Sequence, residues 1–386
     1  MHFYEIMNMR VPFVDFEDEL NVIGNDIERA IKDVIISKKF ILGPKVELFE
    51  NDFARHCGSK HAIGVSSGTA ALHLALESLN IKEGDEVIIP ANTYIATALA
   101  VSYTNAKPIL VDIDESTYNI HASKIRKSIS DKTKAILPVH LYGQPCNIDS
   151  IVQIAKESGI KLVWDACQAH GAFYKGRNVG SLDDIVCFSF YPSKNLGAIG
   201  DGGIITTNNG EIAERIRQLR NYGQERRYYH KFIGYNARLD EVQAAILDVK
   251  LLFLDEWNDK RIKTARQLYN NLLKGVYQVK TPIEIYNVRH VYHLYVVRAK
   301  NREKLQAHLK SKDIDTLIHY PIPIHLQEAY SNDGYNQINL GYKKGDFPVT
   351  EKCADEILSL PMYPEIKEEQ VRHVADSIKE FYAKDR

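Results

Sequence analysis

The sequence predicts an α/β protein: a parallel sheet covered by helices on both faces, followed by a smaller α+β unit. Three observations lead to this prediction. Through the first two-thirds of the 386 residues, short β-rich runs alternate with segments that carry apolar residues at helical spacing. After about residue 240 the pattern changes to one long helix and mixed elements. The chain is also long enough for two domains, since single cores stop growing near ~250–300 residues.

Seven β-rich runs are the expected strands of the sheet. Helical patterns at 69–79 and 122–129 lie between the early runs, and this succession of strand, helix and strand is typical of parallel pairing. Only a short loop around Lys194 separates the last two runs, which favours one antiparallel strand there. The runs cover residues 61–67, 86–91, 107–113, 133–140, 161–167, 185–190 and 202–207.

The C-terminal third reads as a second, smaller domain. A long helical pattern at 241–273 is expected to bridge the two domains, and a β-rich run follows at 290–300. A helix at 302–311, a loop rich in Tyr, Pro and His at 319–330, and a last helix from Glu368 complete the unit. We expect a large domain over 11–250, whose N-terminal segment packs on the small domain, a small domain over 251–386, and a linking helix around 240–274.

Composition excludes several classes of function. The net charge of −1 gives no general attraction to nucleic acid or anionic membrane. No apolar run approaches the roughly 18 residues that span a bilayer, and the first residues lack the apolar core of a signal peptide. Scattered cysteines without a CxxC pair predict reduced thiols in a cytoplasmic protein. His319 and His325 have no neighbours at metal-ligand spacing, so no metal site is expected.

Polar residues follow several strands at the edge of a parallel sheet where ligands bind. After the first strand, Gly68 and Thr69 open a helix, and this turn suits a phosphate or is simply capped by Ser67 or Thr69. After the second strand, Tyr94 is placed either to stack on a flat ligand or to pack in the core.

Two more strands end in candidate catalytic groups. Asp165 closes an apolar run, where a carboxylate needs a cationic or hydrogen-bonding partner, or else it caps a helix. Gln168 follows within one turn. Lys194 lies five residues after Ser189 in a loop of small residues. Without the other features, an ordinary surface lysine would be the more common interpretation. We interpret the surrounding glycines as room for a ligand that approaches Lys194 closely.

A phosphate turn, a flat ring, a carboxylate and a lysine along one sheet edge are what pyridoxal 5′-phosphate requires. The amine would form a Schiff base with the cofactor aldehyde, and its nucleophilicity would be raised by a lowered pKa. The carboxylate would keep the pyridine nitrogen protonated, which makes the ring an electron sink. The four features together therefore favour a pyridoxal phosphate enzyme.

The stretches SSGTAALHLAL, PANTYIATALA, WDACQAHGA, FYPSKNLGAIGDGG and GYNARLDEVQAAIL resemble, in this order, the DegT/StrS-type sugar aminotransferases. The resemblance runs from about Val11 to the C-terminal helix. It implies the aspartate-aminotransferase fold (fold type I), pyridoxal phosphate, L-glutamate as amino donor, and a homodimer whose active sites are shared between two chains.

The resemblance also implies a role for each matching residue. Lys194 would be the Schiff-base lysine and the acid/base, and Asp165 the partner of the pyridine nitrogen. The other cofactor contacts would be Gln168 at the ring hydroxyl, Tyr94 against the ring, Gly68, Thr69 and Ser189 at the phosphate, and Asn236 reaching the phosphate from the other subunit. Arg238 is a candidate for the donor carboxylate.

The likeness is greatest to members that aminate C-3 of a dTDP-3-oxo-6-deoxyhexose, in pathways to surface polysaccharide or antibiotic sugars. Two segments are candidates for sugar and diphosphate contacts. One carries Arg226 and His230 in a cationic, tyrosine-rich stretch, which is otherwise a solvated loop. The other carries Tyr320 and His325, or is a proline-stiffened loop between domains.

Four alternatives compete with C-3 amination. A regulator with this fold is expected to have lost the lysine or the carboxylate, and this chain retains both Lys194 and Asp165. Dehydration at C-3 requires a histidine at the position that Lys194 occupies here. Amination at C-4 would differ only in how the sugar is posed, so the sequence leaves it open. A nicotinamide-dependent enzyme is not favoured, because no strand is followed by GxGxxG.

Overall fold

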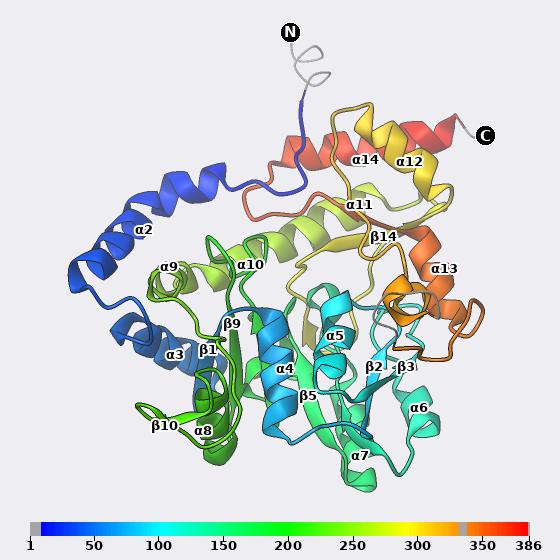
Figure 1. Cartoon of the computed structure of the whole chain (residues 1–386). Coiled ribbons are helices and arrows are strands. Elements are labelled where there is room, and N and C mark those ends of the chain that lie inside the picture. Colours follow the sequence, from blue (N-terminus) through cyan, green and yellow to red (C-terminus); the bar gives the residue numbers. More distant parts are fainter. Residues whose placement is uncertain (1–8, 332–337, 385–386) are drawn as a thin grey trace.

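The computed structural model describes residues 9–331 and 338–384 and contains the predicted seven-stranded sheet (Figure 1). The strand order is β1-β9-β8-β5-β4-β2-β3. Strands from β8 to β3 pair in parallel, whereas β9 is antiparallel to β1 and β8, which confirms the predicted class. The strands are β1 (His61–Val65), β2 (Glu86–Pro90), β3 (Lys107–Val111), β4 (Thr133–Ile136), β5 (Lys161–Asp165), β8 (Ile185–Ser189) and β9 (Gly203–Thr207).

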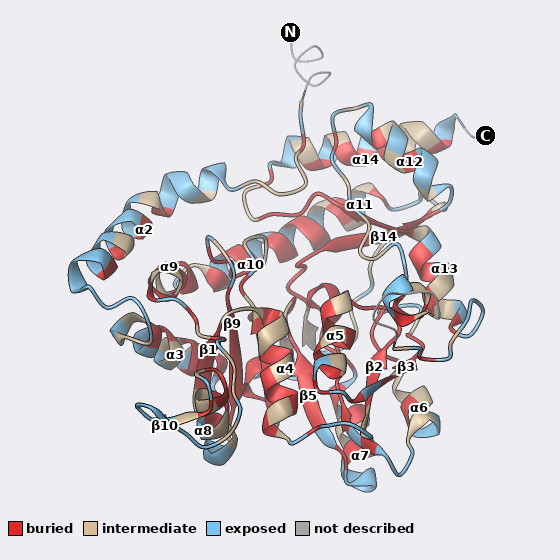
Figure 2. Ribbon diagram, in the orientation of Figure 1, coloured by how far each residue is buried: buried red, intermediate tan, exposed pale blue. Residues whose placement is uncertain are grey.

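Helices cover both faces, so the strands are buried (Figure 2). In β5, Leu162 and Trp164 face a core shared with α3 and α7, while Val163 faces α4, α5 and α8. The helical pattern at 122–129 forms only the short α6 and a 3₁₀ turn at Arg126–Ser128. The helices are α3 (Pro44–Cys57), α4 (Gly68–Ser78), α5 (Ile95–Tyr103), α6 (Ala122–Ile125), α7 (Ile148–Ser158) and α8 (Gly210–Leu219).

The pattern expected to form one bridging helix is interrupted at Leu252 and Phe253. The interruption separates α9 from α10 and lets Trp257 of α10 join Ile246 of α9 in an apolar cluster with α2. These helices are α2 (Glu17–Ser37), α9 (Glu241–Leu251) and α10 (Leu254–Lys263), which continues through a π-helix (Thr264–Tyr269) into α11 (Asn270–Leu272).

The C-terminal part is an antiparallel sheet of order β12-β14-β15 with three helices. The run expected as a strand at 290–300 pairs only from Tyr295, because the residues before it dock on the turn at Leu141–Gly143. There Val291 N–H donates to the Gly143 carbonyl at 3.1 Å. The elements are β12 (Val279–Lys280), β14 (Tyr295–Ala299), β15 (Ile357–Leu360), α12 (Arg302–Lys310), α13 (Pro348–Glu356) and α14 (Glu368–Ala383). Val11 pairs with Ile314 of this part.

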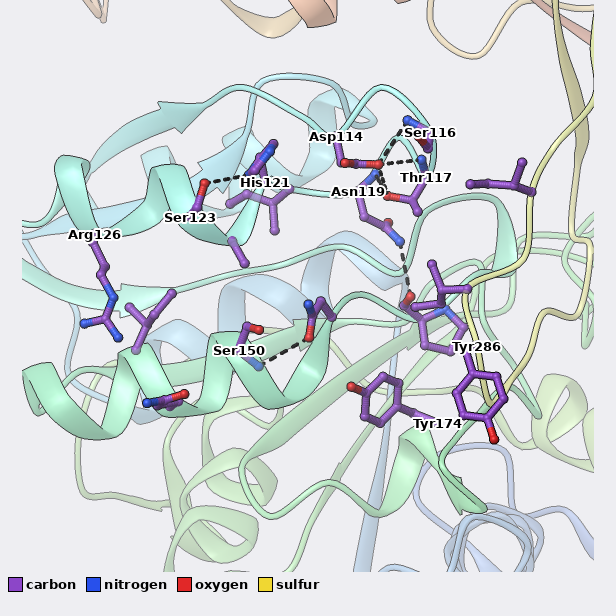
Figure 3. A pocket seen from close by; sticks show the side chains of 18 residues that line it. Asp114, Ser116, Thr117, Asn119, His121, Ser123, Arg126, Ser150, Tyr174 and Tyr286 are labelled. Atoms are coloured by element: carbon purple, nitrogen blue, oxygen red, sulfur yellow. Dashed lines mark hydrogen bonds between the residues drawn. The ribbon is translucent and has the colours of Figure 1, made fainter.

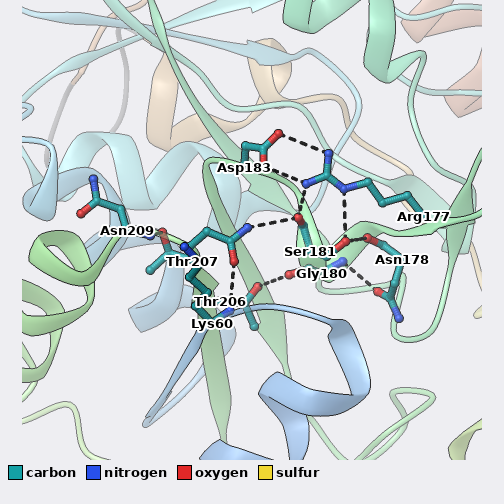
Figure 4. A network of polar contacts seen from close by, with 10 residues as sticks. Lys60, Arg177, Asn178, Gly180, Ser181, Asp183, Thr206, Thr207 and Asn209 are labelled. Atoms are coloured by element: carbon teal, nitrogen blue, oxygen red, sulfur yellow. Dashed lines mark hydrogen bonds and ion pairs between the residues drawn. The ribbon is translucent and has the colours of Figure 1, made fainter.

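A polar network joins the starts of β1 and β8 to the end of β9 (Figure 4). Lys60 N–H donates to Asn208 Oδ1 at 2.9 Å, and the Asn208 amide donates to the Ser181 carbonyl. Thr206 Oγ1 donates to the Gly180 carbonyl at 2.8 Å. These bonds fix the C-terminal end of β9. They lie at the end of the sheet opposite to the strand ends that carry the candidate residues.

Across residues 9–331 and 338–384, no helix combines the length and apolarity that a membrane crossing requires. The same ranges hold no cluster of three or more His, Cys, Asp or Glu side chains arranged to bind a metal ion. All five cysteines are free thiols.

Candidate active site

A cavity of about 530 Å³ opens at the C-terminal ends of β5 and β8, beside the first turns of α4 and α5. Its volume is in the range of small-molecule sites. Eight of the residues proposed from the sequence line it, namely Gly68, Thr69, Tyr94, Asp165, Gln168, Ser189, Lys194 and Tyr320. The topology of the sheet has thus brought together groups that lie up to about 250 positions apart in the chain.

The first turn of α4 is both capped and open to a ligand. Ser67 is the N-cap, and its Oγ accepts a hydrogen bond from Ala70 N–H at 3.0 Å. The N–H groups of Gly68 and Thr69 have no partner within the helix, so the turn retains its capacity for an anion. A Cβ at position 68 would lie 2.5 Å from the Cβ of Ser189, which explains the glycine.

Asp165 ends β5 as a buried carboxylate with two donors. Oδ2 accepts from Thr97 Oγ1 at 3.0 Å, and Oδ1 accepts from Cys167 N–H at 3.1 Å. Burial raises the pKa of Asp165, and the hydrogen bonds from Cys167 and Thr97 and the charge of Lys194 oppose the shift. Among the described residues, Asp165 forms no ion pair within 4 Å, so the site can accept a cationic partner from a ligand.

Lys194 lies in the turn after β8, where its backbone N–H donates to the Tyr191 carbonyl at 2.8 Å. Burial lowers the pKa of the Lys194 amine, while the nearby Cys167 and Asp165 raise it in part. An amine with a lowered pKa is more often neutral at physiological pH and is therefore a better nucleophile.

The glycines around Lys194 do not serve the purpose that we expected from the sequence. Neither Gly197 nor Gly203 lines the cavity. A Cβ on Gly197 would lie 2.1 Å from the Pro192 carbonyl oxygen, and one on Gly203 would lie 2.4 Å from that of Ser67. Close packing of backbone against backbone requires these glycines, and they leave no room for a ligand.

Gln168 and two tyrosines form one wall. Gln168 Oε1 accepts from Tyr142 N–H at 2.6 Å, and its Nε2 donates to the Tyr320 hydroxyl at 3.0 Å. The rings of Tyr94 and Tyr320 lie 5.5 Å apart, and Tyr94 is 55% exposed at the cavity. The exposure of Tyr94 favours contact with a ligand over the core-packing alternative.

Five candidate residues lie outside this cavity. His325 is buried, and its Nε2 contacts Glu351 Oε1 at 2.9 Å. Arg238 Nη1 donates to Asn221 Oδ1 at 3.0 Å. The other three are exposed: Asn236, Arg226 at the end of β10 (Gln224–Arg226), which is labelled in Figure 1, and His230 on its partner strand β11 (Tyr229–His230).

The structure adds lining residues that the sequence did not assign to this site, notably Thr97, Cys167, His293 and His319. Thr97 lies four positions after Thr93, and their hydroxyls are 2.9 Å apart, so helical spacing could have identified it. No signal in the sequence marks His293, whereas His319 begins the 319–330 loop, in which the sequence suggested only Tyr320 and His325 as ligand contacts.

A second cavity, of about 720 Å³, lies between the segments around Asn119 and Tyr286 (Figure 3). Its charged side chains are already engaged: Arg126 pairs with Glu157 at 2.5 Å, and Asp114 accepts from the N–H groups of a turn. Fewer of its side chains are therefore available to bind a charged ligand or to act in catalysis than in the cavity around Lys194.

Comparison with known proteins identifies the family. Residues 21–379 match the DegT/DnrJ/EryC1/StrS aminotransferase family. A pleiotropic regulatory protein of Geobacillus stearothermophilus is 45% identical over 97% of this chain and 99% of its own. A dTDP-3-amino-3,6-dideoxy-alpha-D-galactopyranose transaminase of Aneurinibacillus thermoaerophilus is 45% identical over 96% of this chain and 99% of its own.

Solved structures agree with this match. DesV of Streptomyces venezuelae, in complex with a ketimine intermediate, has a TM-score of 0.93 at 42% identity and covers 96% of this chain and 98% of its own. NtdA of Bacillus subtilis, with bound cofactor PMP, has a TM-score of 0.88 at 31% identity, with 98% and 87% covered. The predictions of an aminotransferase and of its pyridoxal phosphate cofactor are confirmed. The chain belongs to the DegT/DnrJ/EryC1/StrS aminotransferase family.

Proposed function

We propose that this aminotransferase transfers the amino group of L-glutamate to C-3 of a dTDP-linked 3-oxo-6-deoxyhexose. The products are 2-oxoglutarate and a dTDP-3-amino-3,6-dideoxyhexose. One observation carries the proposal: a lysine amine, a buried carboxylate and a helix N-terminus meet around one cavity. The choice of sugar is supported by the name of the Aneurinibacillus thermoaerophilus relative.

The residues present fit pyridoxal phosphate. Asp165 is buried with hydrogen-bond donors but without an ion pair among the described residues, and a protonated pyridine nitrogen would supply the missing positive charge. The first turn of α4, with Gly68 and Thr69, and the adjacent Ser189 hydroxyl would hold the phosphate. Gln168 would face the ring hydroxyl, and Tyr94 would lie against the ring.

When bound, pyridoxal phosphate supplies an electron sink for the electron pair left when a proton leaves the amino-bearing carbon. Asp165 would stabilise positive charge on the ring nitrogen, and Thr97 and Cys167 orient the Asp165 carboxylate. Lys194 Nζ, with its lowered pKa, could take that proton and deliver it to the carbon on the other side of the amino nitrogen. Tyr320 borders the cavity and can bind a sugar hydroxyl.

The proposal includes a homodimer whose active sites are shared. Asn236 is exposed and outside the cavity of its own chain, so its proposed phosphate contact requires a second copy. Arg226 and His230 would reach the substrate diphosphate of that copy, and Arg238 the donor carboxylate. A set of exposed apolar side chains supports such an interface. They are Leu20, Val22, Ile35 and Ile36 on α2 with Phe40, Ile41, Leu48, Ile199 and Leu252.

A second candidate function is regulation without catalysis, because the Geobacillus stearothermophilus relative is named as a regulatory protein. A regulator without catalysis has no need for an intact acid/base lysine, and here Lys194 and Asp165 share one cavity. The proposed location is the cytoplasm, and the five free thiols support it.

The test is a product assay with L-glutamate and dTDP-3-oxo-6-deoxyhexose, with the 4-oxo isomer in a parallel reaction. We expect 2-oxoglutarate and a 3-amino sugar in equal amounts, with the amino carbon assigned by NMR. Amination of the 4-oxo isomer alone would overturn the C-3 assignment. Failure with both sugars in protein that has bound the cofactor would favour the regulator.

A further inference from the structure

The residue after the lysine is a buried amide with all its hydrogen-bonding groups in use. Asn195 is 3% exposed, and its Nδ2 donates to Asn258 Oδ1 at 2.7 Å and to the Val291 carbonyl at 3.1 Å. Its Oδ1 lies 3.1 Å from His293 Nδ1. Asn258 is also fully buried and donates through Nδ2 to the His170 carbonyl at 2.8 Å.

Backbone carbonyls determine the direction of every bond in this network. A carbonyl can only accept, so the amide nitrogen of Asn258 must face His170 and that of Asn195 must face Val291. Asn258 therefore turns its oxygen to Asn195, and both N–H groups of Asn195 are used. The oxygen of Asn195 is left for His293, so the hydrogen of that bond must come from His293 Nδ1.

We propose that Asn195 is a positioning residue, which holds His293 with the hydrogen on Nδ1 and anchors the turn that carries Lys194. The inference rests on the proposed role of Lys194 as the cofactor-binding lysine. With Nδ1 as donor, a neutral imidazole leaves Nε2 as an acceptor. Since His293 lines the cavity, it offers a hydrogen-bond acceptor there and adds no second positive charge beside Lys194.

The surroundings of His293 favour the neutral ring. Burial lowers the pKa of His293 well below its ordinary value, and the charges of Lys194 and Arg261 lower it further. His319 and His170 face it as well, and burial lowers the pKa of His319 to about 4 and that of His170 to about 3. The network thus connects the segment after Asp165, the lysine turn and helix α10 through uncharged groups.

The first test is the tautomer of His293 in the full-length protein, read from long-range ¹H–¹⁵N correlations at pH 7 and assigned with His293→Gln. This readout does not depend on activity or on the cofactor. We expect hydrogen on Nδ1 only. Hydrogen on Nε2 alone, or on both nitrogens, would overturn the proposal.

The second test compares Asn195→Ala with Asn178→Ala. Asn178 is a buried amide in the polar network of Figure 4, does not line the cavity, and accepts from Gly180 N–H at 2.8 Å. Attachment of pyridoxal phosphate is followed by its visible absorption band. We expect the rate of attachment to fall about a hundredfold in Asn195→Ala, because small misplacements cost that much, and to be unchanged in Asn178→Ala.

Equal rates in the two variants would refute the positioning role. If Asn195→Ala does not fold, the tautomer measurement on the unaltered protein still decides. If the unaltered protein binds no pyridoxal phosphate, the proposed function fails instead, whatever the tautomer of His293.

Discussion

Replacing Asp165 with asparagine is expected to act in opposite directions on the cofactor-free and cofactor-loaded protein. The asparagine can adopt the place of the carboxylate without leaving a group unpaired. Its oxygen can accept from Cys167 N–H, and its amide can donate to Thr97 Oγ1. The Thr97 hydroxyl can then donate to Thr93 Oγ1, 2.9 Å away. The substitution therefore removes a buried charge at little cost in hydrogen bonds.

In the cofactor-free protein, removal of this charge should stabilise the fold. A buried neutral polar group without full compensation already costs about 1–3 kcal/mol on mutational scales, and a charged group costs more, so the melting temperature should rise by at least a few degrees at pH 7. Because burial raises the pKa of Asp165, the charged form is disfavoured by folding. The cost of this charge to folding stability is full above the raised pKa and is lost as the pH falls from the raised pKa to the ordinary value. The stability that Asp165→Asn adds should therefore shrink in acid.

In the cofactor-loaded protein the same change leaves a protonated ring nitrogen without its partner. Breaking a buried pair costs about 3–5 kcal/mol, which corresponds to about two to four orders of magnitude in the dissociation constant of pyridoxal phosphate. Asp184→Asn is the control, since burial also raises the pKa of Asp184 but this residue does not line the cavity. It should stabilise the fold and leave cofactor affinity unchanged.

The assays are differential scanning fluorimetry without cofactor and equilibrium titration with pyridoxal phosphate. An Asp165→Asn protein that binds the cofactor as tightly as the unaltered chain would refute the proposed pairing. A cofactor-free variant that melts at a lower temperature would refute the argument about the buried charge.

Three further changes have distinct expected outcomes. Gly68→Ala should lower stability by about 1–3 kcal/mol, because its Cβ would lie 2.5 Å from that of Ser189, and adding Ser189→Gly should restore stability in a urea titration. When Lys194→Ala and Asn236→Ala chains are mixed and refolded together, about a quarter of the unaltered activity should return if sites are shared in a two-fold dimer, because half of the dimers are then mixed and each mixed dimer has one intact site of two. No activity should return if each site is built from one chain. Tyr320→Phe should raise KM for the sugar in steady-state assays while the cofactor band persists, and an unchanged KM would remove Tyr320 from the sugar site.

The parallel sheet made much of the site predictable. Once strands were expected before Gly68, Tyr94, Asp165 and Lys194, their convergence followed from the rule that the carboxyl ends of parallel strands share one edge. The antiparallel β9 was also predictable, because only the loop around Lys194 separates it from β8 and this loop has no helical pattern for a crossover connection.

Other features depend on packing that the sequence does not display. The alternating apolar run at 290–300 indicated a strand throughout, but the turn at Leu141–Gly143 takes its first residues and directs His293 to the cavity. Similarly, nothing local to Gly197 or Gly203 shows that their neighbours are carbonyl oxygens rather than a ligand. Both outcomes arise from contacts between segments far apart in the chain.

The most direct test of the central claim is the absorption spectrum of the purified protein with pyridoxal phosphate, before and after addition of L-glutamate. We expect a visible band from cofactor attached to Lys194, which L-glutamate converts to the shorter-wavelength band of the amino form, and no visible band in Lys194→Ala. A band that persists in Lys194→Ala, or one that L-glutamate leaves unchanged in the unaltered protein, would contradict the proposed glutamate-dependent transamination at Lys194.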